Sequence, residues 1–188
     1  MTIKLENDPT NNSSTGMDRR EFVKTAGAAA AGLLLATPKI VFGSQANSAV
    51  RFGILGVGGR GRAVGSGFVN SAGARVTALA DFFADPIEAG LKYFNDLQGK
   101  KGIPAIDSSQ LFRGPDAYKR IAESREVDFI LITTPPYYHP QHLETVVAAG
   151  KHVYCEKPVA MDVPGAKRVI EIGKKAQGKL SLDVGFQI

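Results

Sequence analysis

The 188-residue chain contains one cysteine, Cys155, three histidines and no tryptophan. A single cysteine excludes an intramolecular disulfide and a zinc cluster built from thiolates. The longest apolar run, residues 26–36, is only about a dozen residues long, whereas a helix needs roughly 20 to span a bilayer. We therefore expect no stable membrane anchor.

The charge pattern is also modest. The net charge is +5, and the basic residues do not form a stripe interleaved with aromatic side chains. We therefore expect no nucleic-acid partner. We interpret the largest basic group as the solvated face of one helix, comprising Lys167, Arg168, Lys174, Lys175 and Lys179.

Residues 1–46 differ in composition from the rest of the chain. Residues 1–16 are polar and lack apolar periodicity, which is typical of disorder. The pair Arg19-Arg20 precedes the short apolar run and resembles a twin-arginine export motif, with Asp18 where Ser or Thr is usual. We therefore expect residues 1–46 to be a signal segment read by the twin-arginine export machinery, and the protein to be exported to the periplasm or beyond.

Three glycines follow the apolar run at residues 50–55. Gly56, Gly58 and Gly61 have the spacing G-x-G-x-x-G, which is typical of the turn between a strand and a helix in dinucleotide-binding units. The first glycine permits the tight turn, the second lets the backbone approach a pyrophosphate, and the third lets the helix pack closely on the strand. The phosphates then bind to unpaired N–H groups of the helix, where the helix dipole favours negative charge.

The next apolar segment, residues 75–80, ends at Asp81. A carboxylate at this place can accept hydrogen bonds from the adenosine ribose hydroxyls. The same carboxylate would repel a 2′-phosphate, and Phe82 and Phe83 supply no cation to hold one. The sequence therefore favours NAD over NADP.

Strand and helix patterns alternate through the rest of the chain, which predicts an α/β fold with a doubly wound, Rossmann-type parallel sheet. On the last helix, which Asp162 caps, we expect Ala166, Val169, Ile170 and Gly173 to form the apolar stripe. We expect strands at 50–55, 75–80, 103–106, 129–133, 152–155 and 180–185, and helices at 60–70, 85–97, 116–123, 140–149 and from 162 onward.

Polar residues follow three of the expected strands: the glycine turn with Asp81, the segment Thr133–His139, and Glu156-Lys157-Pro158. In a doubly wound sheet these segments converge on one crevice. Residues 50–188 here resemble the glucose-fructose oxidoreductase and inositol dehydrogenase (Gfo/Idh/MocA) family. The most specific motif is Ala149-Gly-Lys-His-Val-Tyr-Cys-Glu-Lys-Pro158.

The resemblance implies roles for individual residues. Lys157 matches the family lysine that touches the reacting sugar hydroxyl, where an ammonium would polarise the developing carbonyl and assist proton removal, aided if burial lowers its pKa. The implied cofactor-binding residues are Gly56, Gly58, Gly59, Arg60, Gly61, Asp81, Thr134, Pro135, His139, Glu156 and Lys157.

The resemblance also implies a function and a further domain. We expect an exported NAD-dependent oxidoreductase that transfers hydride between a sugar or cyclitol hydroxyl and a tightly bound nicotinamide. The alternatives are a glycoside hydrolase in which NAD transiently oxidises C3 of the sugar, and a dinucleotide-binding module without catalysis.

The Rossmann domain is expected at residues 47–180. Residues 181–188 are expected to begin the crossover to a second domain, an open antiparallel sheet with helices, which this chain lacks. We therefore expect the chain alone to bind NAD without turning over a sugar, and the full-length form to be a homo-oligomer.

His139 and His142 lie three residues apart, which places them on one face of a helix and raises the alternative of a metal site. Only Glu144 lies near them with a suitable ligand atom. We therefore expect no metal, and we interpret His139 as a cofactor-loop residue and His142 as a helix-surface residue. We expect Cys155 to be a small buried hydrophobe.

Overall fold

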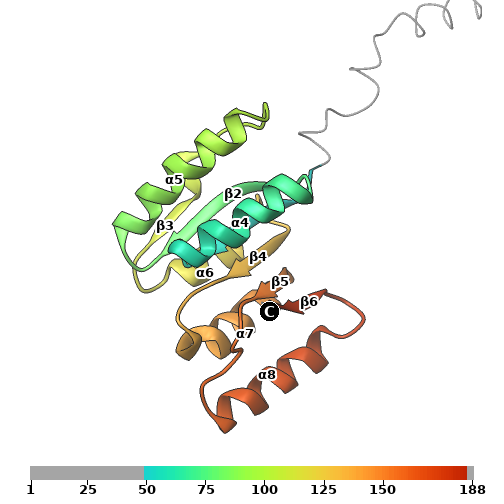
Figure 1. Cartoon of the computed structure of the whole chain (residues 1–188). Helices are drawn as coiled ribbons and strands as arrows, with labels where there is room; N and C mark the ends of the chain where they lie inside the picture. The colour runs from blue at the N-terminus through green and yellow to red at the C-terminus, as the bar shows by residue number, and fades with distance from the viewer. Residues whose placement is uncertain (1–48, 186–188) are drawn as a thin grey trace, which may run out of the picture. The chain divides into compact units, whose positions relative to one another are not determined.

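The computed structural model describes residues 49–185, in which six parallel strands form one sheet in the order β3-β2-β1-β4-β5-β6 (Figure 1). The chain moves outward from β1 to β3 and then returns to place β4 beside β1, which is the doubly wound Rossmann topology that the sequence predicts. The strands are β1 (Arg51–Leu55), β2 (Arg75–Asp81), β3 (Leu111–Arg113), β4 (Phe129–Ile132), β5 (His152–Cys155) and β6 (Leu182–Val184).

Helices pack on both faces of this sheet. The helices are α4 (Gly59–Ser71), α5 (Ala84–Gly99), α6 (Ala117–Glu123), α7 (His139–Ala148) and α8 (Val163–Ala176). Along β1, Phe52 and Ile54 pack with residues of α4 and α5, whereas Leu55 packs with residues of α6, α7 and α8. Because both faces are covered, the central strands are apolar throughout rather than alternating with polar residues.

Local sequence features set several helix ends as expected. Asp162 caps α8, since its carboxylate accepts a 2.7 Å hydrogen bond from the Gly165 N–H. Gly150 follows α7 with a φ of 74°, a conformation that a residue without a side chain adopts at little cost. Leu143 and Val146 of α7 are fully buried, and Val147 is partly buried against the same core.

Residues 103–106 do not form the strand that we predict. The Ile103 N–H donates to the carbonyl of Gln98, and the Ile106 N–H donates to the Asn95 side chain, so α5 takes up the backbone groups that a strand would need. The edge strand is instead β3, which follows a short 3-10 turn at Ser108–Gln110.

Helix α8 is rotated relative to our prediction. The side chain of Ile170 is 58% exposed, whereas Ile172 and Ala176 are buried against the sheet with Val169 beside them. The spacing from 169 to 172 to 176 is the helical repeat that faces the core. The basic residues expected to be solvated are exposed, but Lys179 lies beyond the end of α8.

The strand expected at 180–185 is β6, which pairs in parallel with β5, so the sheet extends past the expected domain boundary at residue 180. The signal segment at 1–46 and the chain end at 186–188 lie outside the described residues. Within residues 49–185, every helix is too short or too polar to cross a bilayer.

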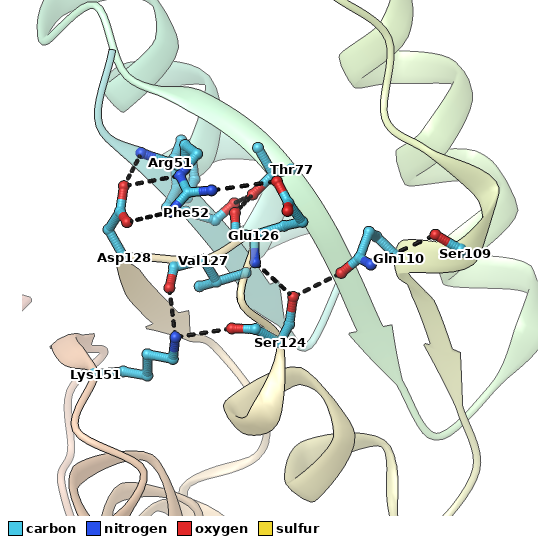
Figure 2. A network of polar contacts seen from close by, with 10 residues as sticks. All are labelled: Arg51, Phe52, Thr77, Ser109, Gln110, Ser124, Glu126, Val127, Asp128 and Lys151. Atoms are coloured by element: carbon cyan, nitrogen blue, oxygen red, sulfur yellow. Dashed lines mark hydrogen bonds and ion pairs between the residues drawn. The ribbon is translucent and has the colours of Figure 1, made fainter. Parts of the chain in front are cut away.

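A polar network joins the amino ends of β1, β4 and β5 (Figure 2). The backbone N–H of Arg51 and its guanidinium both donate to the Asp128 carboxylate, at 2.9 and 2.8 Å. The ammonium of Lys151 donates to the carbonyls of Ser124 and Val127 at 2.8 and 2.7 Å. These contacts stabilise the end of the sheet opposite to the predicted crevice.

Candidate dinucleotide site

The turn after β1 requires glycine at its first position. Gly56 has a φ of 94°, and a Cβ there would lie 2.7 Å from the backbone carbonyl carbon of Thr133. The Gly56 N–H donates to the Ala80 carbonyl at 2.8 Å, and the Thr133 hydroxyl donates to the Gly56 carbonyl at 2.6 Å. The turn is therefore fixed from β2 and from the end of β4.

The other two glycines of the motif have different surroundings. A Cβ on Gly61 would lie 2.2 Å from the Gly56 carbonyl oxygen, so α4 can pack on the turn only without a side chain there. A Cβ on Gly58 would have no heavy atom within 4 Å. Gly58 therefore faces open space, where the backbone is accessible to a ligand.

Helix α4 begins directly at this open space. Its N-cap residue Gly58 offers no side chain to the helix, and the first helical hydrogen bond runs from the Arg62 N–H to the Gly58 carbonyl. The N–H groups of Gly59, Arg60 and Gly61 precede that bond and have no partner within the helix. Such a helix start binds anions, since both the N–H groups and the helix dipole favour negative charge.

Asp81 lies beside the same turn. One carboxylate oxygen accepts from the Val57 N–H at 2.8 Å, and the other accepts from the Phe83 N–H at 3.1 Å. Each oxygen retains a lone pair, so the carboxylate can still accept a hydroxyl hydrogen bond. Arg113, which no sequence motif indicates, is the backbone register partner of Asp81 on β3, and its side chain is exposed.

The segment after β4 is held to the segment after β5 by His139, which is buried at the start of α7. Its Nε2 lies 2.7 Å from the Thr134 carbonyl oxygen, and its Nδ1 lies 2.8 Å from the Pro158 carbonyl oxygen. Carbonyl oxygens only accept, so both hydrogen bonds form together when both ring nitrogens carry hydrogen. The ring nitrogens of His139 thus bind the protein backbone, and its contact with a cofactor stays a prediction.

His142 is not the helix-surface residue that we predict. Its side chain is largely buried between the rings of Tyr118 and Tyr138, and its Nδ1 lies 3.0 Å from the Thr134 hydroxyl. Burial, and after it the charge of His139, lowers the pKa of His142 to about 4, so the imidazole is neutral at pH 7. Among residues 49–185, no three His, Cys, Asp or Glu side chains are grouped so that they could hold a metal ion.

The segment after β5 carries Glu156 and Lys157. Glu156 is only 4% exposed, and its carboxylate accepts a 2.7 Å hydrogen bond from the Arg60 guanidinium on α4. The sequence indicates Arg60 and Glu156 separately as site residues. Their pairing is not predictable from it, because 96 positions separate them. Lys157 is exposed, so the described residues do not provide the burial considered for it from the sequence.

Cys155 is fully buried, as expected. Burial, with a smaller contribution from Glu156, raises the pKa of its thiol to about 12. A thiol with so high a pKa is a poor nucleophile at neutral pH, and the residue serves packing.

The glycine turn, Asp81 and the polar segments after β4 and β5 all lie at the carboxyl ends of neighbouring strands. Shallow hollows elsewhere, about 370 Å³ beside Arg120 and about 350 Å³ between α7 and α8, include none of them. In an open α/β sheet the ligand crevice lies at the carboxyl ends of the strands, where the direction of winding reverses. The topology, the glycine turn and the acid at the end of β2 define a Rossmann-type dinucleotide-binding domain.

The family described as "Oxidoreductase family, NAD-binding Rossmann fold" matches residues 50–184. The chain therefore belongs to the Gfo/Idh/MocA family of oxidoreductases.

The chain is also similar to curated proteins and to a solved structure. The chain is 26% identical to a glycosyl hydrolase family 109 protein of Shewanella pealeana, over 86% of this chain and 38% of that protein. It is 29% identical to an inositol 2-dehydrogenase of Klebsiella pneumoniae, over 73% of this chain and 36% of that protein. A crystal structure of a putative myo-inositol dehydrogenase from Sinorhizobium meliloti is similar with a TM-score of 0.53 and 29% identity, over 73% of this chain and 36% of that one. The chain thus spans less than two-fifths of the length of these relatives.

Proposed function

We propose that this chain is the cofactor-binding part of an oxidoreductase that transfers hydride between a hydroxyl of a sugar or cyclitol and a tightly held nicotinamide. The observation that carries the proposal is the 2.8 Å hydrogen bond from the Val57 N–H to Asp81. It holds a ribose-binding carboxylate beside the open backbone of Gly58 and the start of α4. The family assignment and the inositol 2-dehydrogenase relative support the same reaction class.

For the cofactor we propose NAD rather than NADP. The Asp81 carboxylate would repel a 2′-phosphate while accepting hydrogen bonds from ribose hydroxyls. Arg113, the register partner of Asp81 on β3, would weaken this repulsion without removing it.

Lys157 is the proposed catalytic residue. A bound nicotinamide supplies the hydride acceptor. The exposed ammonium of Lys157 would donate a hydrogen bond to the reacting hydroxyl oxygen and stabilise the carbonyl that develops there, which would assist loss of the hydroxyl proton to water. We propose that the loops bearing Thr134 and Pro135 and the Glu156-Lys157 pair line the nicotinamide half of the cofactor.

Calorimetry on the purified chain tests the binding part of the proposal. NAD should release or absorb heat with one site per chain, and Asp81→Ala should weaken that binding about tenfold or more, because a charge-assisted acceptor is lost. Asp85→Ala is the matched control, since Asp85 lies in the next helix outside the turn. If NAD gives no heat with the folded chain, the proposal is wrong.

The relative named as a glycosyl hydrolase family 109 protein favours a second candidate, an NAD-dependent glycoside hydrolase with transient oxidation at C3. With a full-length form of the protein, exchange of the C2 hydrogen with solvent and sugar release, without net NADH, would identify the hydrolase. Net NADH formation would identify the dehydrogenase. If Lys157→Ala leaves every measured property unchanged, a non-catalytic binding module is the better interpretation.

We further propose export by the twin-arginine route and a homo-oligomeric full-length form. The support for export is the Arg19-Arg20 pair before a short apolar run, in residues outside the described part of the chain. Replacing both residues (Arg19→Lys with Arg20→Lys) should retain the protein in the cytoplasm of a bacterium with an active twin-arginine transporter. Fractionation followed by immunodetection measures this. Size-exclusion chromatography with light scattering on a full-length form tests the oligomeric state.

A further inference from the structure

The ion pair between Arg60 and Glu156 connects the two ends of the candidate site. Arg60 is the second residue of α4, beside the N–H groups that we propose to hold a pyrophosphate. Glu156 directly follows β5 and precedes Lys157. The guanidinium Nη2 lies 2.7 Å from the Glu156 Oε1 across the carboxyl edge of the sheet.

Glu156 depends on this contact. Its side chain is 6% exposed, and among residues 49–185 the Arg60 guanidinium is the one side-chain donor to its carboxylate. Gly185, which directly follows β6, lies against the Glu156 carboxylate, since a Cβ on Gly185 would be 2.6 Å from Oε1. A buried carboxylate is costly to the fold unless it is paired and hydrogen-bonded. Arg60 therefore holds the Glu156 carboxylate in position.

Arg60 has bonding capacity beyond this pair. A guanidinium has five N–H groups in one plane, and the described residues of the chain accept from it only at Glu156. Its side chain is 38% exposed, so part of the guanidinium is accessible from solvent. An oxygen of a ligand phosphate at the start of α4 could accept from Arg60 while Glu156 remains bound. A lysine at this position has a compact point charge without the planar fork of donors.

We propose that Arg60 is a positioning residue that couples the phosphate end of the site to the nicotinamide end. By donating to a pyrophosphate oxygen and to Glu156 together, it holds Glu156 and the adjoining Lys157 where the nicotinamide half of the ligand must bind. This inference rests on the proposed binding of NAD.

Binding measurements on the full chain test the coupling. We would titrate NAD and ADP-ribose, which lacks the nicotinamide, into the wild type, Arg60→Gln, Arg60→Lys, Glu156→Gln and the double variant Arg60→Gln with Glu156→Gln. Arg60→Gln should weaken both ligands, and NAD by about tenfold more than ADP-ribose, which is the loss of one charge-assisted hydrogen bond. Glu156→Gln should weaken NAD selectively, and should add little in the Arg60→Gln background.

Arg60→Lys separates positioning from folding. It keeps a cation beside Glu156, so the thermal midpoint should stay near that of the wild type while the NAD to ADP-ribose affinity ratio falls. Independent, additive effects of Arg60→Gln and Glu156→Gln on NAD would overturn the inference. An NAD to ADP-ribose affinity ratio in Arg60→Lys equal to that of the wild type would also overturn it. Failure of the wild type to bind NAD or ADP-ribose contradicts the proposed function itself, which is a different result.

Discussion

The Nδ1 of His139 lies 2.8 Å from the carbonyl oxygen of Pro158 and so ties the start of α7 to the segment that follows β5. The other ring nitrogen binds the carbonyl of Thr134. One buried side chain thus lies against both polar segments at the proposed nicotinamide end of the crevice. The residue that the sequence places in a cofactor loop acts in the structure as a connection between two loops.

Replacing His139 should destabilise the fold. His139→Leu removes the ring nitrogens that lie within hydrogen-bond distance of the Thr134 and Pro158 carbonyls, and a buried carbonyl left unpaired costs about 1–3 kcal/mol. Urea unfolding followed by circular dichroism measures the free energy of unfolding. Gln141→Ala, at an exposed position of the same helix, should change it by less than about 0.5 kcal/mol. Equal stability of His139→Leu and the wild type would contradict the role of His139 as a connection between the two loops.

Two glycines of α4 should respond to alanine in opposite directions. Gly61→Ala places a Cβ 2.2 Å from the Gly56 carbonyl oxygen, so it should distort the turn, lower stability and weaken NAD binding. Gly67→Ala meets no atom within 4 Å and should stabilise the helix by about 0.5–1 kcal/mol. Thermal unfolding and calorimetry with NAD check both variants. A Gly61→Ala variant that binds NAD normally would contradict the close packing of α4 on the turn.

Asp81 and Arg113 should together decide the preference for NAD. Asp81→Asn removes the charge that repels a 2′-phosphate, so NADP binding should strengthen about tenfold or more while Arg113 remains. Adding Arg113→Ala should abolish that gain, and Arg113→Ala alone should leave NAD affinity nearly unchanged. Calorimetric titration of the four proteins with each cofactor measures these affinities. If NADP binds Asp81→Asn no better than the wild type, the repulsion argument fails.

The ion pair at the amino end of the sheet predicts a pH dependence of stability. Hydrogen bonding to Arg51 lowers the pKa of Asp128, so the ionised form stabilises the fold. This stabilisation is present above the unfolded value of about 3.9 and is lost as the pH falls through the lower folded value. Asp128→Asn should cost about 1 kcal/mol at pH 7, since both side chains are partly exposed.

Urea unfolding at several pH values measures this effect. The difference between Asp128→Asn and the wild type should shrink as the pH falls below about 4. Asp116→Asn, in an exposed pair with Lys119, serves as the control and should have little effect at any pH. A difference that stays constant down to pH 2 would show that the carboxylate charge is not the cause.

Local patterns in the sequence determined the alternation of strands and helices, and with it the topology. The turn at Gly56 and the acid at Asp81 were equally predictable, because a turn conformation and the end of an apolar run depend on neighbouring residues. The resemblance that marked Glu156 and Lys157 likewise rests on a continuous motif.

Tertiary packing decided the rest. Arg60 meets Glu156 because α4 begins and β5 ends at the same edge of the sheet, and His142 is buried where Tyr118 and Tyr138 pack against it. The edge strand is Leu111–Arg113 and not the predicted segment 103–106, because α5 forms hydrogen bonds with the backbone of that earlier segment. Periodicity is a property of adjacent residues, whereas the partner of a side chain depends on which elements the folded sheet brings together.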